Sequence, residues 1–461
     1  MKQKQSLSKQ AILYLSGDLI LQTVSVVAGL VFARLLTPES YGVYSVYMAW
    51  VAIISAVLLL RSDGTLQIVM NSNEREWPCY VSSVTILGVL NSILIAALCI
   101  IVSQITQIDF FGIGTTLVPL LFIHSFGTAM LSFTSVKYAI QRKALKNFIF
   151  KVLISLSTVL LSIVLITRSG LQQSLSRILG AAIPYVAAGF ILTAENILEG
   201  KGGLNKKYWK LCVGLSAPLI LSAIASRIMV QCDRIMLQQL MGNETAGIYS
   251  FAGSITTVLS TIYTAVATAW SPEYNKALCS NNIEWVTEHA RHYRNLITGV
   301  FCAFLFAYRE PFYVVASPNY YPSVEIIPFY AIAIYLGFLY TFPVNYEFFK
   351  KKTKAIGLGN VFAGVINVIL NAILIPHFSM LGAIFATCIS HGCMLIVHDV
   401  FVRKYIGGYH FSIGFYCKGI TLLITSVIAS EVITLPALRW GIASVIGVIL
   451  LCQIVERRAF I

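Results

Sequence analysis

The stretch from Val81 to Ile105 reads VSSVTILGVLNSILIAALCIIVSQI and contains no charged residue. A helix needs about 20 apolar residues to cross the hydrocarbon core of a bilayer, so this run predicts a transmembrane helix. Similar long runs follow one another along the chain, unlike the roughly ten-residue alternating strands of an outer-membrane barrel. The predicted fold class is therefore all-α, a polytopic membrane protein.

The composition supports the same class. Of the 461 residues, 57% are hydrophobic and 11% are charged, and the mean hydropathy is +0.79. A soluble domain carries roughly 25% charged residues. These values exclude a soluble enzyme, a disordered chain and a collagen-like chain, and they leave little room for a soluble domain.

Hydropathy and loop residues predict about fourteen spans, arranged as twelve plus two. A count that differs by one helix pair would place the termini on the same side of the membrane, so twelve spans remain an alternative. The predicted spans are 10–33, 43–68, 81–105, 116–137, 150–167, 177–198, 211–237, 248–270, 295–308, 324–347, 355–375, 380–402, 413–430 and 440–455.

The formal charge of +14, from 33 Lys and Arg against 19 Asp and Glu, follows this topology. Cytoplasmic loops of membrane proteins retain Lys and Arg. With the N-terminus inside, most basic residues fall in cytoplasmic segments, and both termini are predicted to be cytoplasmic. The charge therefore reports topology and predicts no nucleic-acid partner. The few basic residues placed outside are Arg34, Arg168, Arg177, Arg309 and Arg439.

Two pairs of similar segments indicate an internal duplication. ESYGVYS at 39–45 resembles ETAGIYS at 244–250, and YAIQRKALK at 138–146 resembles YEFFKKKTK at 346–354. The offsets are nearly equal, and each half has an even number of spans, which predicts two lobes related by a pseudo-two-fold axis along the membrane normal. The predicted domains are an N-terminal six-helix lobe (1–198), a basic cytoplasmic linker (199–210), a C-terminal six-helix lobe (211–410) and two additional transmembrane helices (411–461).

Polar and ionisable residues inside the spans are the candidate site, because such groups are costly in hydrocarbon and usually face a cavity or a partner. Helical spacing places several of them on shared faces. They are Asp18 and Gln22 in the first span, Arg61 and Asp63 in the second, Arg227, Gln231, Asp233 and Arg234 in the seventh, and Asn367 and Asn371 in the eleventh.

The arginines favour an anionic, phosphate-bearing substrate over a cation, because guanidinium groups bind phosphate in a bidentate manner. Structural interpretations remain open for several of these residues. Gln22 and the two asparagines can bond neighbouring helices. Arg34 and Arg234 can extend to the outer interface, and an ion pair with Asp18 or Asp63 can neutralise Arg61.

The chain lacks sequence patterns for hydrolysis or metal binding. No phosphate-binding lysine loop, nucleophile elbow or H-E-x-x-H motif occurs. The ten scattered cysteines form no C-x-x-C. His391 and His398 share a helix face beside Asp399; a metal or proton site is conceivable there, but satisfied structural histidines are the favoured interpretation. We therefore predict no enzymatic activity, no cofactor and no metal.

Several short segments occur in a characteristic order along the chain. The first is ARLLTPESYGVY at 33–44. Later segments are Pro218 with DRIML at 233–237, GIYS at 247–250, and Asn367, Asn371 and Pro376 followed by Gly382-Ala383. Each motif is loose by itself, but their order and spacing cover nearly the whole chain. Together they resemble polysaccharide-biosynthesis flippases of the Wzx type, which belong to the multidrug/oligosaccharidyl-lipid/polysaccharide exporter superfamily.

The resemblance implies a flippase that moves undecaprenyl-diphosphate-linked oligosaccharide units, such as O-antigen for lipopolysaccharide biosynthesis, to the periplasmic leaflet of the bacterial inner membrane. It implies alternating access by a V-shaped pair of lobes around a cationic cavity. Arg61 and Arg227 are then the first candidates for diphosphate contacts, with Arg34 and Arg234 second. Asp18, Asp63 and Asp233 would position arginines or carry a coupling proton. Besides the lipid bilayer, the polymerase and other polysaccharide-assembly proteins are candidate partners.

Three alternatives are retained. A lipid II flippase shares the fourteen spans and a basic cavity. An ion-coupled multidrug exporter of the same superfamily would need a cavity dominated by acidic residues. A polymerase or ligase of the same pathway usually has a large outside loop, whereas the longest one predicted here runs from Arg309 to Ser323.

Overall fold

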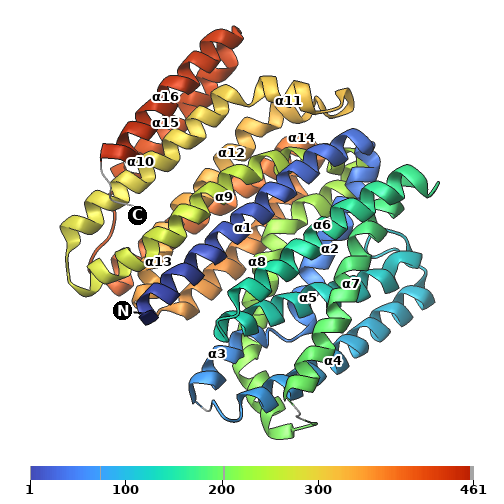
Figure 1. Cartoon of the computed structure of the whole chain (residues 1–461). Helices are drawn as coiled ribbons and strands as arrows, with labels where there is room; N and C mark the ends of the chain where they lie inside the picture. The colour runs from blue at the N-terminus through green and yellow to red at the C-terminus, as the bar shows by residue number, and fades with distance from the viewer. Residues whose placement is uncertain (1, 73, 201–202, 457–461) are drawn as a thin grey trace. The chain divides into compact units, whose positions relative to one another are not determined.

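The computed structural model describes residues 2–72, 74–200 and 203–456, and these residues contain helices and no strand (Figure 1). The chain divides into two compact units: residues 1–28 and 35–247 form unit 1, and residues 29–34 and 248–461 form unit 2. The all-α, polytopic class predicted from the sequence is confirmed. The structure groups residues 211–247 with unit 1, whereas the predicted lobe boundary lies in the linker at 199–210.

Unit 1 contains the first eight helices of the chain. They are α1 (Lys2–Leu35, whose end lies in unit 2), α2 (Pro38–Leu58), α3 (Asp63–Ser72), α4 (Trp77–Thr106), α5 (Val118–Ile140), α6 (Ala144–Arg168), α7 (Gln173–Gly200) and α8 (Lys206–Met241), with a short 3-10 helix η1 (Thr115–Leu117).

Unit 2 contains the remaining helices. They are α9 (Asn243–Cys279, whose first turn belongs to unit 1), α10 (Ile283–Ala307), α11 (Arg309–Val315), α12 (Ser323–Leu339), α13 (Thr341–Phe349), α14 (Thr353–Phe401), α15 (Ile413–Val432) and α16 (Pro436–Glu456), with a 3-10 helix η2 (Pro318–Tyr320) and a π-helix η3 (Val402–Ile406).

Several helices of the described residues have the length that a membrane span requires. Among these residues, ten helices are long and apolar enough to cross a membrane, or eleven if the bent α8 counts as one span. The helix α14 has 49 residues and a non-helical residue, Ser379 (φ 51°). At 1.5 Å per residue it exceeds twice the roughly 30 Å hydrocarbon core, so it provides the two predicted spans on either side of residue 379. The end of α1 adds a shorter apolar helix, Ile20–Leu35.

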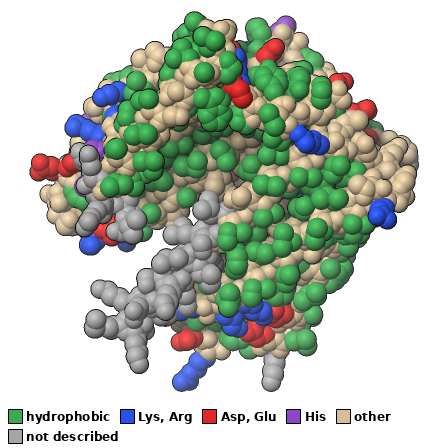
Figure 2. Space-filling view, turned by 45° about the horizontal axis from the view of Figure 1, so that its top comes forward, with side chains coloured by type: hydrophobic (Ala, Val, Ile, Leu, Met, Phe, Trp, Pro, Cys, Tyr) green, Lys and Arg blue, Asp and Glu red, His purple; other side chains and the backbone are tan. Residues whose placement is uncertain are grey.

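The outer faces of the helices are apolar. On α4, for example, Ile93 is 61% exposed and Leu94 is 59% exposed. Figure 2 shows hydrophobic side chains covering much of the face in view, with few charged ones among them. A monomeric soluble protein rarely exposes such large apolar areas, whereas a bilayer covers them. These surfaces support a multi-pass membrane protein.

Side-chain caps set several helix starts. The Thr37 hydroxyl accepts a hydrogen bond from the backbone N–H of Ser40, and Pro38 occupies the first turn of α2. The Asn205 side chain accepts bonds from the first turn of α8, and Asn282 accepts one from the first turn of α10. These are the residue types that satisfy the free N–H groups at a helix start.

The predicted second span, 43–68, is two helices rather than one. The helix α2 ends at Leu58, and α3 begins at Asp63. Between them Leu60 and Arg61 adopt left-handed backbone angles, with φ of 53° and 52°. A break at membrane depth leaves a carbonyl without its helical partner. Here the Leu58 carbonyl accepts hydrogen bonds from the side chains of Asn91 (3.0 Å) and Ser92 (3.2 Å) of α4.

The core of unit 1 holds the short helix α3 in place. Leu66 of α3 is fully buried beside Trp77 and Tyr80 of α4. The Trp77 ring N–H donates to the Leu66 carbonyl at 3.0 Å, and the hydroxyls of Tyr80 and Thr65 lie 2.7 Å apart. The break between α2 and α3 is therefore a defined element that packing and hydrogen bonds stabilise.

Candidate functional site

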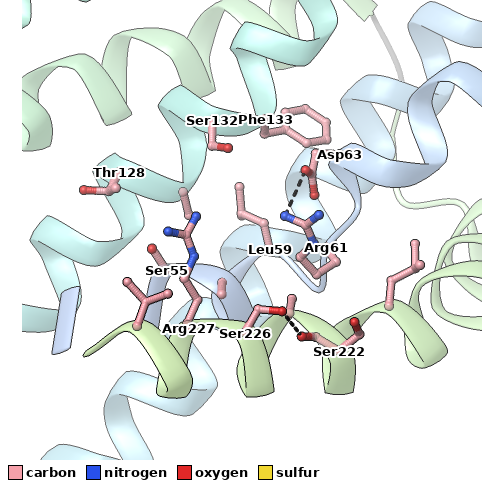
Figure 3. A pocket seen from close by; sticks show the side chains of 15 residues that line it. Ser55, Leu59, Arg61, Asp63, Thr128, Ser132, Phe133, Ser222, Ser226 and Arg227 are labelled. Atoms are coloured by element: carbon pink, nitrogen blue, oxygen red, sulfur yellow. Dashed lines mark hydrogen bonds and ion pairs between the residues drawn. The ribbon is translucent and has the colours of Figure 1, made fainter. Parts of the chain in front are cut away.

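A pocket of about 460 Å³ lies in unit 1, where the α2–α3 break meets α5 and α8 (Figure 3). Its lining is rich in small and hydroxyl side chains, which leaves room around three charged groups. The lining residues are Ser55, Ala56, Leu59, Arg61, Asp63, Thr128, Ala129, Ser132, Phe133, Leu219, Ser222, Ala223, Ser226, Arg227 and Val230.

Arg61 reaches this pocket from the break itself. One guanidinium nitrogen, Nη1, lies 3.2 Å from an oxygen of Asp63, and the side chain is 36% exposed. Its Nε is buried and has no hydrogen-bond partner among the described residues. The break thus carries a partly exposed cation that lines the pocket, and the Nε of this cation has no hydrogen-bond partner among the described residues.

Arg227 enters from α8. Figure 3 shows its guanidinium and that of Arg61 pointing into the same space, with Leu59 between them in this view. Arg227 is exposed and makes no hydrogen bond or ion pair with a described residue. An arginine that faces a pocket without a counter-charge is suited to bind an anion.

The hydroxyl groups around the arginines bond to the backbone of their own helices. Ser226 donates to the Ser222 carbonyl at 2.8 Å, as the dashed line in Figure 3 marks. Thr128 donates to the His124 carbonyl at 3.1 Å, and Ser55 donates to the Ala52 carbonyl at 3.2 Å. Each hydroxyl can rotate toward a ligand, so these groups give a polar lining without adding charge.

The pocket therefore carries two permanent positive charges against one carboxylate. A net positive, partly enclosed site attracts anions, and it disfavours cations. Within residues 20–456, apart from the positions without a described side chain, no group of three His, Cys, Asp or Glu residues is arranged to hold a metal ion. The chemistry offered here is anion binding by guanidinium and hydroxyl groups.

The structure places Arg34 outside this pocket. Its Nε donates to the Val315 carbonyl at 2.7 Å, and its Nη2 donates to the Val314 carbonyl. Both carbonyls lie at the end of α11, where a helix leaves acceptors free and favours a cation. Arg34 thus stabilises the C-terminus of α11 in unit 2.

Arg234 and its neighbours on α8 also lie outside the pocket lining. Arg234 Nη1 donates to the Gln231 side chain at 2.9 Å. Asp233 is 5% exposed, and the Cys232 thiol lies 3.7 Å from one of its oxygens. The residues of the predicted polar face of the seventh span therefore have different surroundings. Arg227 lines the pocket, whereas Gln231 and Arg234 are hydrogen-bonded to each other.

The remaining predicted residues lie elsewhere. Asn371 donates to the Asn367 side chain at 3.1 Å, and Asn367 lies 3.3 Å from the Thr387 hydroxyl, all on α14 in unit 2. Gln22 is half-buried on α1. The side chain of Asp18 lies outside the described residues, so the predicted Asp18–Arg61 ion pair stays a prediction.

Sequence reasoning missed the hydroxyl lining and the helix break. Ser222 and Ser226 are spaced i, i+4 beside the Arg227 face, and this spacing is a signal that would have predicted them. The polar run Arg61-Ser62-Asp63-Gly64 interrupts an otherwise apolar span. Thr128 and Ser132 on α5 resemble ordinary transmembrane serines and threonines in sequence, and their role follows from tertiary contacts alone.

Comparison with known proteins agrees with this fold. A family model described as polysaccharide biosynthesis protein matches residues 7–276. No curated protein sequence matches the chain. A solved structure of the lipid II flippase MurJ in an inward closed conformation is similar with a TM-score of 0.74 at 14% identity, covering 97% of this chain and 99% of that one.

Two other solved structures extend the comparison. An inward-facing multidrug resistance MATE family transporter of the MOP superfamily has a TM-score of 0.62 at 14% identity, with 92% and 100% of the two chains covered. A MOP superfamily transporter from Pyrococcus furiosus has a TM-score of 0.58 at 12% identity, with 88% and 97% covered. These likenesses establish the transporter fold.

Proposed function

Because the chain belongs to the family of polysaccharide biosynthesis proteins, we propose that it is a flippase for lipid-linked oligosaccharides. Its substrate is an undecaprenyl-diphosphate-linked repeat unit of O-antigen or a similar surface polysaccharide. The protein carries the head group from the cytoplasmic to the periplasmic leaflet of the bacterial inner membrane by alternating access.

The observation that carries this proposal is the pairing of Arg61 and Arg227 in one pocket. A diphosphate spreads its negative charge over several oxygens, and two guanidinium groups can contact it at once. The surrounding serines and threonines offer donors and acceptors to the phosphates or to the first sugar. Asn91 and Ser92 support the break that carries Arg61, which keeps the cation at the pocket edge.

Asp63 is an internal competitor for the same cation. In this structure its carboxylate occupies one side of the Arg61 guanidinium. An arriving diphosphate carries more negative charge than the Asp63 carboxylate and displaces it from Arg61. When the diphosphate leaves, the Asp63 carboxylate binds Arg61 again. Binding is thereby weakened enough to permit release, which a carrier requires because uniformly tight binding would slow its cycle.

A lipid II flippase is the second candidate, favoured by the whole-chain similarity to MurJ. The pocket chemistry is the same for both, because each substrate carries an isoprenoid diphosphate. An ion-coupled multidrug exporter fits less well, since a cationic drug would meet two arginines and a single carboxylate.

Gene deletion followed by analysis of lipid-linked sugars tests the function. We expect the undecaprenyl-linked repeat unit to accumulate on the cytoplasmic leaflet and surface polysaccharide to disappear. Accumulation of lipid II, with normal surface polysaccharide, would replace the first candidate by the second. Unchanged lipid-linked intermediates would contradict both.

A further inference from the structure

Two turns with similar sequences occupy corresponding places in the two units. The turn between α5 and α6 of unit 1 lies in YAIQRKALK at 138–146, and the turn between α13 and α14 of unit 2 lies in YEFFKKKTK at 346–354. Arg142 and Lys351 each have a φ of 58°, and in both turns the next residue donates its backbone N–H to the carbonyl five positions earlier. This is a common form of helix ending, so the two turns differ in their side chains rather than in their backbone.

The basic side chains of the unit 1 turn are paired with carboxylates of α7. Lys143 Nζ lies 3.3 Å from Glu199, and Lys146 Nζ lies 2.9 Å from Glu195. Lys137, which is 1% exposed, contacts the same two carboxylates. The unit 1 turn therefore carries its own counter-charges.

The unit 2 turn has no such counter-charge. Its four lysines are exposed, and none of them forms an ion pair with a carboxylate that the structure describes. They are Lys350, Lys351, Lys352 and Lys354. The helices α13 and α14 contain two acidic residues, and both have other partners. Glu347 is 0% exposed and lies 2.8 Å from His398, and Asp399 is bound by Arg403 and by the Tyr416 hydroxyl at 3.2 Å.

A fifth lysine lies on the neighbouring π-helix η3, which packs against α13. Lys404 of η3 is exposed. The Tyr346 hydroxyl joins the two segments, because it donates to the Gly407 carbonyl at 3.4 Å and accepts from the Tyr409 N–H at 3.3 Å. Together the five lysines form a surface that we call the basic patch, and its residues are Lys350, Lys351, Lys352, Lys354 and Lys404.

The chain connection holds the basic patch at the membrane surface. The candidate span Ser323–Phe349 ends directly before it, and the candidate span Thr353–Ile406 begins within it. The three residues between these spans reach roughly 10 Å at full extension, which is about one Debye length at physiological salt. The lysines are therefore within electrostatic reach of lipid headgroups, whichever side of the membrane the turn faces.

Exposed aromatic side chains flank the basic patch. Phe348 is 55% exposed and Tyr405 is 75% exposed. Lys350 Nζ lies 5.5 Å from the ring centroids of both Tyr346 and Phe349. Aromatic rings are enriched at the membrane–water interface, and lysine stems extend along apolar surface while the charged end stays in the polar layer. This combination fits a lipid headgroup layer better than it fits a soluble acidic partner.

We propose that the basic patch binds the phosphate groups of anionic phospholipids in the adjacent leaflet. A basic segment beside a membrane span gains binding free energy from each lysine that lies near an anionic lipid surface. Ammonium groups on flexible stems can follow mobile lipid phosphates, which offer no fixed geometry. The unit 1 turn is not expected to bind them, because its carboxylates already occupy its lysines. This binding requires neither the pocket around Arg61 and Arg227 nor the proposed flippase activity.

Native mass spectrometry of the purified full-length protein tests the basic patch. We expect the wild type to bind phosphatidylglycerol more tightly than zwitterionic phosphatidylethanolamine. Lys351→Gln combined with Lys352→Gln should raise the Kd for phosphatidylglycerol roughly 30-fold, which is about fivefold for each lysine. Lys351→Arg combined with Lys352→Arg keeps both charges and should keep the wild-type Kd. A photoreactive phosphatidylglycerol should label a peptide that contains residues 346–354.

The matched control is Lys143→Gln combined with Lys146→Gln, which removes the same charge from the unit 1 turn and should leave the Kd unchanged. Equal Kd values for the wild type and the unit 2 glutamine variant would overturn the proposal. Equal weakening by both pairs of substitutions would also overturn it, because the total charge of the protein would then set the binding. Loss of binding in Arg227→Ala alone would place the anionic lipid in the arginine pocket instead.

Discussion

At the scale of single residues, the two arginines of the pocket differ in their surroundings. Arg61 is held at the helix break by the ion pair with Asp63, whereas Arg227 is exposed to the pocket without a counter-charge. Arg227 therefore contributes more binding free energy to an incoming diphosphate than Arg61 does, because Arg61 must exchange the Asp63 carboxylate for the diphosphate. Each arginine gives a separate prediction.

Replacing Arg227 should weaken binding of an isoprenoid diphosphate. A hydrogen bond to a charged group contributes about 1.5–3 kcal/mol, so Arg227→Ala should raise the Kd for farnesyl diphosphate roughly 10- to 150-fold in a calorimetric titration. Arg227→Lys should recover part of the loss, because an ammonium group keeps the charge but not the bidentate geometry. Arg168→Ala, which removes an exposed arginine outside the pocket, is the control, and equal Kd values in all variants would exclude Arg227 from the site.

Replacing Asp63 should have the opposite effect on affinity. Asp63→Asn removes the competing charge from Arg61, and a partly exposed ion pair such as this one contributes up to about 1 kcal/mol. The same titration should therefore show binding about two- to fivefold tighter, with slower flipping in proteoliposomes because release is slowed. Glu74→Gln removes an exposed carboxylate elsewhere and should change neither value. Weaker binding in Asp63→Asn would mean that the carboxylate positions Arg61 rather than competes for it.

At the scale of helices, the repeated segments at 39–45 and 244–250 meet each other. A Cβ placed on Gly42 would lie 1.8 Å from the Asn243 carbonyl oxygen, and one placed on Gly247 would lie 1.9 Å from the Pro38 carbonyl oxygen. The contact is reciprocal. Gly42 and Gly247 occupy equivalent positions in the duplicated motif, and so do the residues that they meet, Asn243 and Pro38. Glycine at these positions lets the starts of α2 and α9 approach backbone to backbone.

This close approach predicts a stability effect. Gly42→Ala or Gly247→Ala should separate the two helix starts and destabilise the protein by about 2 kcal/mol or more, as overpacking does. The melting temperature of purified protein, followed by tryptophan fluorescence, should fall in both variants. Gly214 of α8 has open space around it, so Gly214→Ala should leave the melting temperature unchanged or slightly raised. Normal melting of both variants would show that the helices can separate at little cost.

At the scale of the whole molecule, the helix order and the apolar outer faces indicate a multi-pass membrane protein, and the basic loops predict which side each loop faces. The short segment after α11 contains Ser317 and is predicted to lie outside. The turn between α9 and α10 contains Ser280 and is predicted to lie inside. These two sites test the proposed orientation.

Cysteine labelling with a membrane-impermeant maleimide checks this orientation in intact cells. The native Cys279, Cys417 and Cys452 are exposed and must first be replaced. In intact cells the maleimide should then label Ser317→Cys. It should label Ser280→Cys only after the membrane has been permeabilised. The reverse pattern would invert the predicted topology and place both termini outside.

The sequence by itself determined the all-α membrane class and the candidate polar residues within the spans, and it left twelve or fourteen spans open. Hydropathy is a local property, so runs such as 81–105 and 380–402 predict helices without knowledge of their neighbours. The same local reasoning identified Arg61 and Arg227 as costly exceptions to an apolar composition. The duplicated motif was also readable in the sequence, but the contact between its two copies was not.

Tertiary structure alone decided which of these residues share a pocket. Arg34 and Arg61 were both candidate diphosphate contacts from the sequence. In the structure, Arg34 donates to carbonyls at the end of α11, about 280 positions away in the chain. The break after Leu58 persists because Asn91 and Ser92 accommodate the freed carbonyl, and Glu347 and His398 pair across 51 positions. Burial and hydrogen bonding depend on contacts between distant segments, and local hydropathy carries no information about those contacts.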